Sequence, residues 1–436
     1  MDVVFARVLL VVLAPVVVAA PPRWAVLAWL VMTNLDATGS GQASNLQVGW
    51  LNAVKAVALP AWLSVRLHRY RGDLHSAPGA RAWLALAAYA ALSAVWSDFP
   101  LAGGKLAAGM LAILLAAAAL DKAARAGLLD DRVVLYWLAI SLGLAVFQTV
   151  FFADGSFGFA GRGMPQRLTS FVAAQQYAAL LVAFIAWVLW TPRLSTRWRT
   201  GLLLALLAAL AANGSRTWSA GALAALLVHA LVTRSYLRGL IRVAAALIVL
   251  ASVPAIRRGF VKQPAGEPAN RLTATASAFL SGQDRADGMG LGTMRFRLRM
   301  YSGTLKALRA GTPRQWIFGH GAAAGGRLAV MMFPYAYRPD SLDPNRVIHN
   351  EWLRVAYEWG ALGMMAWLAT LVSLGVLAWR RRHSPAGGAL LAYMPALLLG
   401  LSAENVIDGA GNAVTAGLVV LVALAFETAE AQGSST

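Results

Sequence analysis

The residue types best suited to chemistry stand in the stretch RVIHNEWLRVAYEWGALG, from Arg346 to Gly363. His349 and Asn350 lie where a polar segment meets a long apolar helix, and the N–H groups at such a helix start face water without intrahelical partners. A histidine at this boundary can accept a proton near pH 7. Nine residues separate Asn350 from Gly360, and Gly363 follows on the same face. The alternative is a helix-capping His–Asn pair that only orients a loop.

The composition of the whole chain indicates the environment of this stretch. Of the 436 residues, 59% are hydrophobic and 13% are charged, and the mean hydropathy is +0.60. Soluble domains are nearer a quarter charged, whereas repeated apolar runs of about twenty residues are typical of helices that cross a membrane. We therefore predict an all-α polytopic integral membrane protein. Because the chain has no cysteine, disulfides, iron–sulfur clusters and Cys-ligated zinc sites are excluded.

The apolar segments predict about twelve transmembrane helices. Residues 1–34, interrupted by Pro15, Pro21 and Pro22, fit either one kinked span or a tight hairpin. The further segments are 46–63, 80–96, 101–120, 132–152, 171–190, 200–212, 216–232, 239–256, 351–378, 388–404 and 412–428. This pattern divides the chain into three parts. Residues 1–256 form an N-terminal transmembrane bundle, residues 257–350 a large polar and partly helical segment, and residues 351–436 the C-terminal transmembrane helices.

Basic residues predict the orientation of these helices. Arginine and lysine cluster in alternate loops, which the positive-inside rule assigns to the cytoplasm. They are Arg66, Arg69, Arg71, Lys122, Arg125, Arg132, Arg193, Arg197, Arg199, Arg234, Arg238, Arg380, Arg381 and Arg382. These loops are our first explanation of the formal net charge of +19, ahead of nucleic-acid binding. Both chain ends then lie in the cytoplasm, and the 257–350 segment faces outward.

The outward face is nevertheless rich in arginine, against the usual trend. Three of these arginines, Arg162, Arg167 and Arg216, lie in short connections. The others lie in the large segment and are Arg271, Arg285, Arg295, Arg297, Arg299, Arg309, Arg314, Arg327, Arg338 and Arg346. Arginine in such places is costly and usually functional. Its planar guanidinium suits phosphate because it makes two charge-assisted hydrogen bonds at once. For any single arginine, the alternative is contact with an anionic lipid headgroup.

One amphipathic helix, expected at residues 294–309, separates these arginines into two groups. We expect its apolar face to consist of Met294, Leu298, Tyr301, Leu305 and Leu308, and its solvated stripe to consist of Arg295, Arg299, Ser302, Lys306 and Arg309. Arg297 belongs to neither set, because it lies at the border of the apolar face, where a charge needs a buried partner. Arg297 is therefore the stronger functional candidate and Arg299 the fallback.

Histidines outside the cytoplasmic face are few. On this topology His68, His75 and His383 are cytoplasmic and His229 lies near the inner end of a span, so His320 and His349 face outward. His320 stands in the Gly-rich turn IFGHGAAAGG, where a structural role is the alternative, and His349 is the better candidate for a base.

These features together resemble the O-antigen ligase family, over roughly residues 160–365. The resemblance rests on His349-Asn350 with Gly360 and Gly363, on Arg297 with Tyr301 followed by PRQWIFGHG, and on SRT at 215–217. Arg167, in RLTSF before Gln175-Gln176, resembles another family arginine, although the family has asparagine where glutamine stands here. Tyr301 occupies a position where tryptophan is usual.

The resemblance implies a GT-C-like glycosyltransferase in the bacterial inner membrane with its active site facing the periplasm. Such an enzyme transfers O-antigen polysaccharide from undecaprenyl pyrophosphate to a sugar hydroxyl of lipid A–core oligosaccharide, with inversion and without metal or cofactor. We expect His349 to act as general base, and Arg216 and Arg297 to bind the pyrophosphate and stabilise the leaving charge. Further substrate contacts are expected from Arg162, Arg167, Arg299, Asn350, Tyr301 and His320.

Several alternatives remain at the level of the sequence. Glu404 or Asp408, near the outer face, could supply the base in place of His349. An O-antigen polymerase or a protein O-oligosaccharyltransferase of the same superfamily would use the same residues. A lipid-linked oligosaccharide transporter is the alternative from another class, but the ionisable groups concentrate in the connections rather than in the spans.

Overall fold

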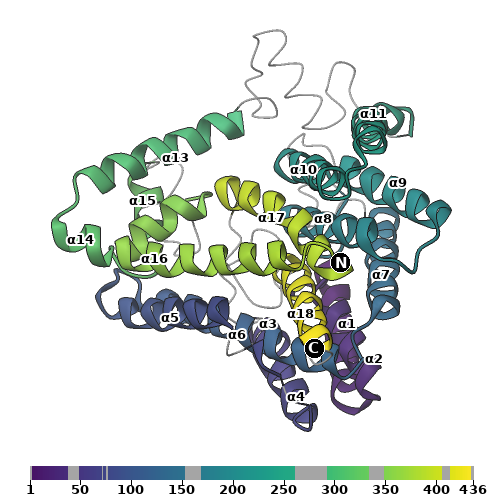
Figure 1. Ribbon diagram of the computed structural model, residues 1–436. Helices are drawn as coiled ribbons and strands as arrows, with labels where there is room; N and C mark the ends of the chain where they lie inside the picture. Colours follow the sequence, from purple (N-terminus) through teal and green to yellow (C-terminus); the bar gives the residue numbers. More distant parts are fainter. Residues whose placement is uncertain are drawn as a thin grey trace.

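The computed structural model describes residues 2–37, 49–70, 72–74, 77–152, 168–260, 292–332, 348–404 and 413–433, and the regular elements within these ranges are helical. Figure 1 shows their arrangement. The α-helices are α1 (Asp2–Ala19), α2 (Pro22–Met32), α3 (Gly49–Ala53), α4 (Leu59–Arg66), α5 (Pro78–Ser93), α6 (Pro100–Arg125), α7 (Asp131–Phe151), α8 (Ala174–Trp190), α9 (Thr196–Asn213), α10 (Arg216–Val232), α11 (Tyr236–Phe260), α13 (Gly292–Arg309), α14 (Pro313–Phe318), α15 (Gly325–Met332), α16 (Glu351–Arg380), α17 (Pro385–Ala403) and α18 (Ala413–Gly433).

Every apolar segment expected from the sequence coincides with one to three consecutive helical elements. Five helices in the described part of the chain are long and apolar enough to cross a membrane, namely α1, α6, α7, α16 and α17, and shorter apolar helices include α2, α8 and α10. Large apolar side chains such as Val95, Leu101 and Leu237 are exposed, as expected of surfaces that face lipid. The molecule is therefore a multi-pass helical membrane protein, and the full count of twelve spans stays a prediction.

The N-terminal segment forms two helices rather than one kinked span. α1 ends at Ala19, and α2 begins at Pro22 and packs against α1. Pro21 and Pro22 explain the break, because proline has no N–H to continue a helix but fits its first turn. Pro15 is accommodated inside α1.

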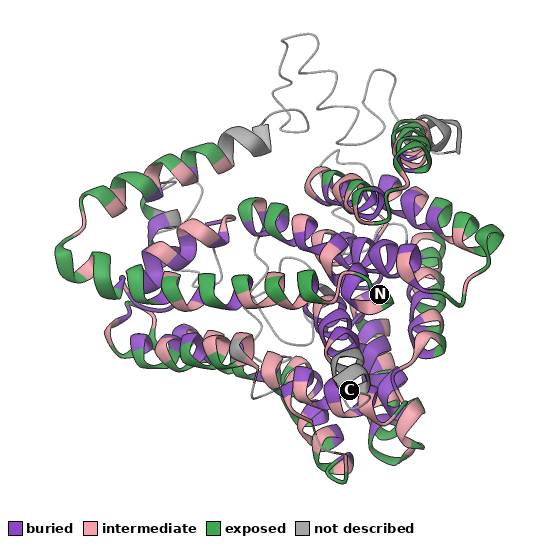
Figure 2. Cartoon of the chain, in the orientation of Figure 1, coloured by how far each residue is buried: buried purple, intermediate pink, exposed green. Residues whose placement is uncertain are grey.

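The centre of the bundle is α8, whose residues are buried almost all round, as Figure 2 shows for the region where α8, α17 and α18 meet. A helix that is apolar on every side is stable only when it is enclosed by other helices or lipid. Small residues bring its neighbours α10 and α17 close together: a Cβ on Gly221 would lie 2.7 Å from the Cβ of Ala396, and one on Gly400 would lie 2.6 Å from the ring of Trp218. These two contacts show that α10 and α17 run antiparallel.

The segment expected at 257–350 contributes three described helices, α13, α14 and α15. They lie together beside α16 at one edge of the molecule, as Figure 1 shows. α11 continues to Phe260, so the expected boundary after residue 256 falls within a helix.

Candidate active site

Helix α13 carries Arg297 toward the rest of the protein. The amphipathic helix expected at 294–309 is confirmed, but the expected apolar face is wrong in part. Leu298 and Leu305 are 53% and 41% exposed, whereas Met300 and Thr304 are buried. The helix is rotated so that Met300 packs in a small core with Ala324, Leu328, Ile348 and Tyr357, and Leu298 and Leu305 are left on the outer surface. Because Arg297, Met300, Tyr301 and Thr304 follow helical spacing, Arg297 falls on the inward face.

Arg297 has the partner that its position at the border of an apolar face requires. Its Nη2 donates to Oε1 of Glu404 at 3.0 Å, and Glu404 is 7% exposed. Glu404 follows the last residue of α17, so this ion pair joins α13 to the end of a membrane helix 107 positions away in sequence. The carboxylate holds the guanidinium in one place at that end of the bundle.

Tyr301, one turn after Arg297, reaches the start of α16. Its hydroxyl donates to the backbone carbonyl of His349 at 2.8 Å and lies 3.2 Å from the carbonyl of Ser402. Burial raises the pKa of the Tyr301 phenol, the guanidinium of Arg297 opposes this effect, and the carboxylate of Glu404 adds to it. The phenol therefore stays protonated at neutral pH and remains a donor.

His349 and Asn350 form the junction expected before α16. Asn350 is the N-cap, and its Oδ1 accepts from the N–H of Leu353 at 3.0 Å, while its Nδ2 donates to the carbonyl of Ser402 at 3.0 Å. His349 has a left-handed backbone with φ of 50°, a conformation that most residues avoid but that histidine adopts more readily than β-branched residues. Strained backbone of this kind concentrates at functional sites. Asn350 thus has the capping role, and His349 is held in a costly conformation beside it.

Arg216 is brought to the same end of the bundle by helix packing. It is the first residue of α10, and α10 runs antiparallel to α17 with Trp218 opposite Gly400. The start of α10 therefore lies at the end of α17 that carries Ser402 and Glu404. Arg216 is half-buried there. Two arginines and one histidine from separate parts of the sequence converge on one end of α17.

The glycines of the His–Asn stretch have a structural explanation. Gly360 interrupts α16 with φ of 59°, and a Cβ there would lie 2.6 Å from the nitrogen of Gly319 and 2.6 Å from the carbonyl oxygen of Ile317. Just before this break, the carbonyls of Tyr357 and Glu358 accept from the N–H groups of His320 and Gly321, both at 2.9 Å. The Gly-rich turn therefore docks on the break in α16.

His320 itself contributes to this docking. Its ring stacks on Tyr357, with 4.0 Å between centroids and 13° between planes, and its Nδ1 lies 3.1 Å from the Tyr357 carbonyl. These contacts agree with the structural alternative for His320. A role in substrate binding stays a prediction.

A buried ionic cluster supports the same turn, and the sequence analysis missed it. Arg354 lies between Glu351 and Glu358 on α16, at 3.6 Å and 3.5 Å, and all three side chains are at most 3% exposed. Glu358 also accepts from the backbone N–H groups of Ala323 and Gly325. The signal was present in the sequence, because three charges spaced by three and four residues in an apolar helix need one another as partners.

The other expected site residues lie in different surroundings. Arg162, Arg167 and Asp408 lie outside the described residues. Arg299 is exposed on the outer side of α13, away from the face that carries Arg297. Within the described ranges, no group of three or more His, Asp or Glu side chains is arranged to hold a metal ion.

The fold and this convergence of side chains define a multi-pass helical membrane protein with a polar site at one end of its bundle. Residues 201–368 match the family model described as O-antigen ligase, and the match includes Arg216, Arg297, Tyr301, His349 and Gly360. The resemblance of the chain to the O-antigen ligase family is thereby confirmed. None of the curated proteins compared with the chain matches it. Members of the family are glycosyltransferase-like ligases, so the match supports an enzyme acting on a lipid-linked polysaccharide and a lipid acceptor in general.

Proposed function

We propose that this protein is an O-antigen ligase of the bacterial inner membrane. It transfers O-antigen polysaccharide from undecaprenyl pyrophosphate to a sugar hydroxyl of lipid A–core oligosaccharide, at the periplasmic face. The observation that carries the proposal is the meeting of Arg297 and Tyr301 with His349 at the end of α17, on the segment that matches the family. The basic loops at the other ends of the helices support a periplasmic site.

In the proposed reaction, the acceptor hydroxyl oxygen attacks the anomeric carbon of the donor sugar. The imidazole of His349 takes the hydroxyl proton as the new glycosidic bond forms. The bond between the anomeric carbon and the pyrophosphate oxygen breaks on the opposite side of the ring, so the anomeric configuration inverts. The electron pair leaves with the pyrophosphate, and Arg297 and Arg216 stabilise the charge that develops on it. Guanidinium groups take the neutralising role, so the proposal requires no metal.

Glu404 is the less suitable base in this arrangement. Its Oε1 already accepts from Arg297, and its side chain is largely buried beside Tyr301. We assign Glu404 to positioning Arg297. This assignment leaves His349, the residue before the N-cap of α16, as the proposed base.

The test is transfer in vitro by the purified protein, with undecaprenyl-pyrophosphate-linked glycan and lipid A–core as substrates. We expect glycan on lipid A–core with the wild type, no change with EDTA, and a loss of about 100-fold or more in Arg297→Ala. Arg309→Ala is the matched control, because Arg309 is exposed on the same helix. Lengthened lipid-linked glycan with unmodified core would make the protein a polymerase. Transfer to a protein acceptor would make it an O-oligosaccharyltransferase, and export of glycan without transfer would make it a transporter.

A further inference from the structure

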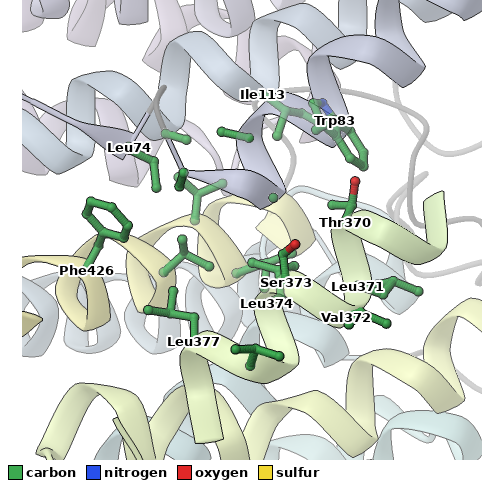
Figure 3. Close-up of a pocket in the computed structure, with 18 of the residues that line it drawn as sticks. Leu74, Trp83, Ile113, Thr370, Leu371, Val372, Ser373, Leu374, Leu377 and Phe426 are labelled. Atoms are coloured by element: carbon green, nitrogen blue, oxygen red, sulfur yellow. The ribbon is translucent and has the colours of Figure 1, made fainter. Parts of the chain in front are cut away.

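A large apolar cavity lies between helices α5, α6, α16 and α18, and none of the described residues of the proposed active site lines it. Its volume is about 500 Å³, and Figure 3 shows side chains such as Trp83, Ile113, Leu374 and Phe426 pointing into it. The cavity borders the second half of α16, from Trp367 onward, whereas His349 precedes the first residue of that helix. It is therefore distinct from the site proposed for transfer.

The walls of this cavity do not suit water. Apart from two arginines, the polar side chains among its described lining residues are Thr370, Ser373, Thr415 and the indoles of Trp83 and Trp367. The Trp83 indole N–H already donates to the carbonyl of Met110 at 2.8 Å. The hydroxyls of Thr370 and Ser373 already donate to carbonyls within α16, at 3.0 Å and 2.7 Å. A water molecule in a cavity needs two to four polar partners. In a bilayer, an apolar cavity of this kind is better filled by a hydrocarbon chain.

Two arginines give the lining of the cavity a positive charge. Arg380 and Arg381, at the end of α16, line it, and among the described lining residues they are the charged ones. A third arginine, Arg125, lies with its guanidinium 5.8 Å from the centre of the Phe426 ring, and its charge is paired with Asp121 and Asp73 at 3.2 Å and 3.6 Å. An apolar chamber with arginines in its lining is complementary to a lipid with a hydrocarbon chain and an anionic headgroup.

We propose that this cavity binds one anionic phospholipid, with an acyl chain between α16 and α18 and its phosphate at Arg380 and Arg381. The size of the cavity favours a lipid chain over a partner helix. A helix with its side chains is about 10–12 Å across and needs some twenty residues to span a bilayer, whereas about 500 Å³ lies within the range of small-ligand sites. The lipid comes from the leaflet on the side of the basic loops, and it is a structural ligand independent of the transfer reaction.

Native mass spectrometry of the detergent-purified full-length protein tests this proposal. Phosphatidylglycerol and phosphatidylcholine with the same acyl chains are added separately. We expect one phosphatidylglycerol to be retained and phosphatidylcholine to be released. In the double variant Arg380→Gln/Arg381→Gln, retention should weaken about tenfold to thirtyfold. Arg380→Lys/Arg381→Lys should restore most of it, which shows that a loss in the glutamine variant is due to charge rather than to misfolding.

Two further variants distinguish binding in the cavity from a general effect of positive charge on lipid retention. Arg197→Gln/Arg238→Gln removes the same charge from exposed positions on the same side, and it should retain phosphatidylglycerol like the wild type. Ala117→Phe places a ring in the cavity and should abolish retention. Equal retention of phosphatidylcholine, or unchanged retention in the Arg380→Gln/Arg381→Gln variant, would overturn the proposal. So would a polyprenyl phosphate bound in place of phosphatidylglycerol. None of these readouts depends on transfer activity.

Discussion

The hydroxyl of Tyr301 donates to the backbone carbonyl of His349 at 2.8 Å, across 48 positions of sequence. This bond ties α13 to the residue that immediately precedes Asn350, the N-cap of α16. Because the bond goes to the main chain, it fixes the position of the His349 backbone at the start of α16. Arg297 lies one turn earlier on the same helix, so a single element positions the proposed base and a proposed phosphate ligand together.

Replacing Tyr301 by phenylalanine should lower both stability and transfer. Loss of the hydrogen bond costs about 1 kcal/mol and leaves the His349 carbonyl without this donor. The pKa of Tyr301 is raised above its ordinary value of 10.0, so the neutral phenol is favoured in the fold. Its contribution is fully present below pH 10.0 and is lost as the pH rises through the raised pKa. The Tm difference between wild type and Tyr301→Phe should therefore be constant near neutral pH and change only in strong alkali. The exposed Tyr236 provides the control, as Tyr236→Phe.

Asparagine at position 349 should separate folding from chemistry. Asparagine tolerates a left-handed backbone, so His349→Asn should keep the wild-type Tm. Transfer should fall about 100-fold to 10,000-fold, as expected for loss of a general base. His349→Val should instead lose about 1–3 kcal/mol of stability, because a β-branched residue is strained at this φ. Wild-type transfer by His349→Asn would exclude histidine as the base.

Glu404 variants should distinguish positioning from proton transfer. Glutamine still accepts a hydrogen bond from Arg297, so Glu404→Gln should retain most activity, whereas Glu404→Ala should lose roughly tenfold to a hundredfold. Initial transfer rates over a range of donor concentrations measure the activity of both Glu404 variants. If Glu404→Gln is as inactive as Arg297→Ala while His349→Asn is active, Glu404 is the base and the roles are exchanged.

A methyl group at Gly360 should be far more harmful than one elsewhere on α16. Gly360→Ala combines a left-handed backbone with contacts to Gly319 and Ile317 that are too short, and it should cost more than about 3 kcal/mol. Gly375→Ala, where a Cβ meets nothing within 4 Å, should be neutral or stabilising by about 0.5–1 kcal/mol. Thermal unfolding in detergent compares the two. Equal Tm values would show that the break in α16 is unimportant.

Two arginine ion pairs on neighbouring elements should differ sharply in their importance for stability. Arg354 is buried between Glu351 and Glu358, so Arg354→Gln leaves uncompensated buried charge and should cost about 3–5 kcal/mol. Arg327 pairs with Asp98 at 2.9 Å, but both side chains are largely exposed, so Arg327→Gln should cost about 0–1 kcal/mol after solvent screening. Both are measured as changes in Tm. A similar Tm for the two variants would contradict the role assigned to the cluster around Glu358.

Local sequence patterns were sufficient to predict the helices and the special position of Arg297. Apolar runs located the membrane helices because lipid forces the backbone into helices. Helical spacing placed Arg297 at the edge of an apolar face, where a charge needs a partner, and its ion pair with the buried Glu404 supplies that partner. The same spacing misassigned Leu298 and Leu305, because the apolar residues of α13 are spread too widely to share one face, and its sequence alone does not say which of them meet the neighbouring helices.

The relationships between distant segments could not be predicted in this way. Arg297 finds Glu404, and Tyr301 finds His349, only because α13 folds back over the ends of α16 and α17. The placement of Arg216 depends on the antiparallel packing of α10 on α17 through Gly221 and Gly400. Likewise, the sequence identifies Gly360 as part of a motif but does not predict its left-handed φ, because that conformation depends on the contact with the turn around Gly319.

The break in α16 also has a mechanical consequence. An interrupted helix normally exchanges its amide hydrogens quickly and serves as a hinge, because carbonyls near the break have lost their intrahelical donors. Here the N–H groups of His320 and Gly321 take their place at Tyr357 and Glu358. The bend at Gly360 should therefore behave as a rigid elbow, with slow hydrogen exchange at His320 and Gly321. Motion that accompanies substrate entry would then have to occur elsewhere, with α13, α14, α15 and both halves of α16 moving as one body.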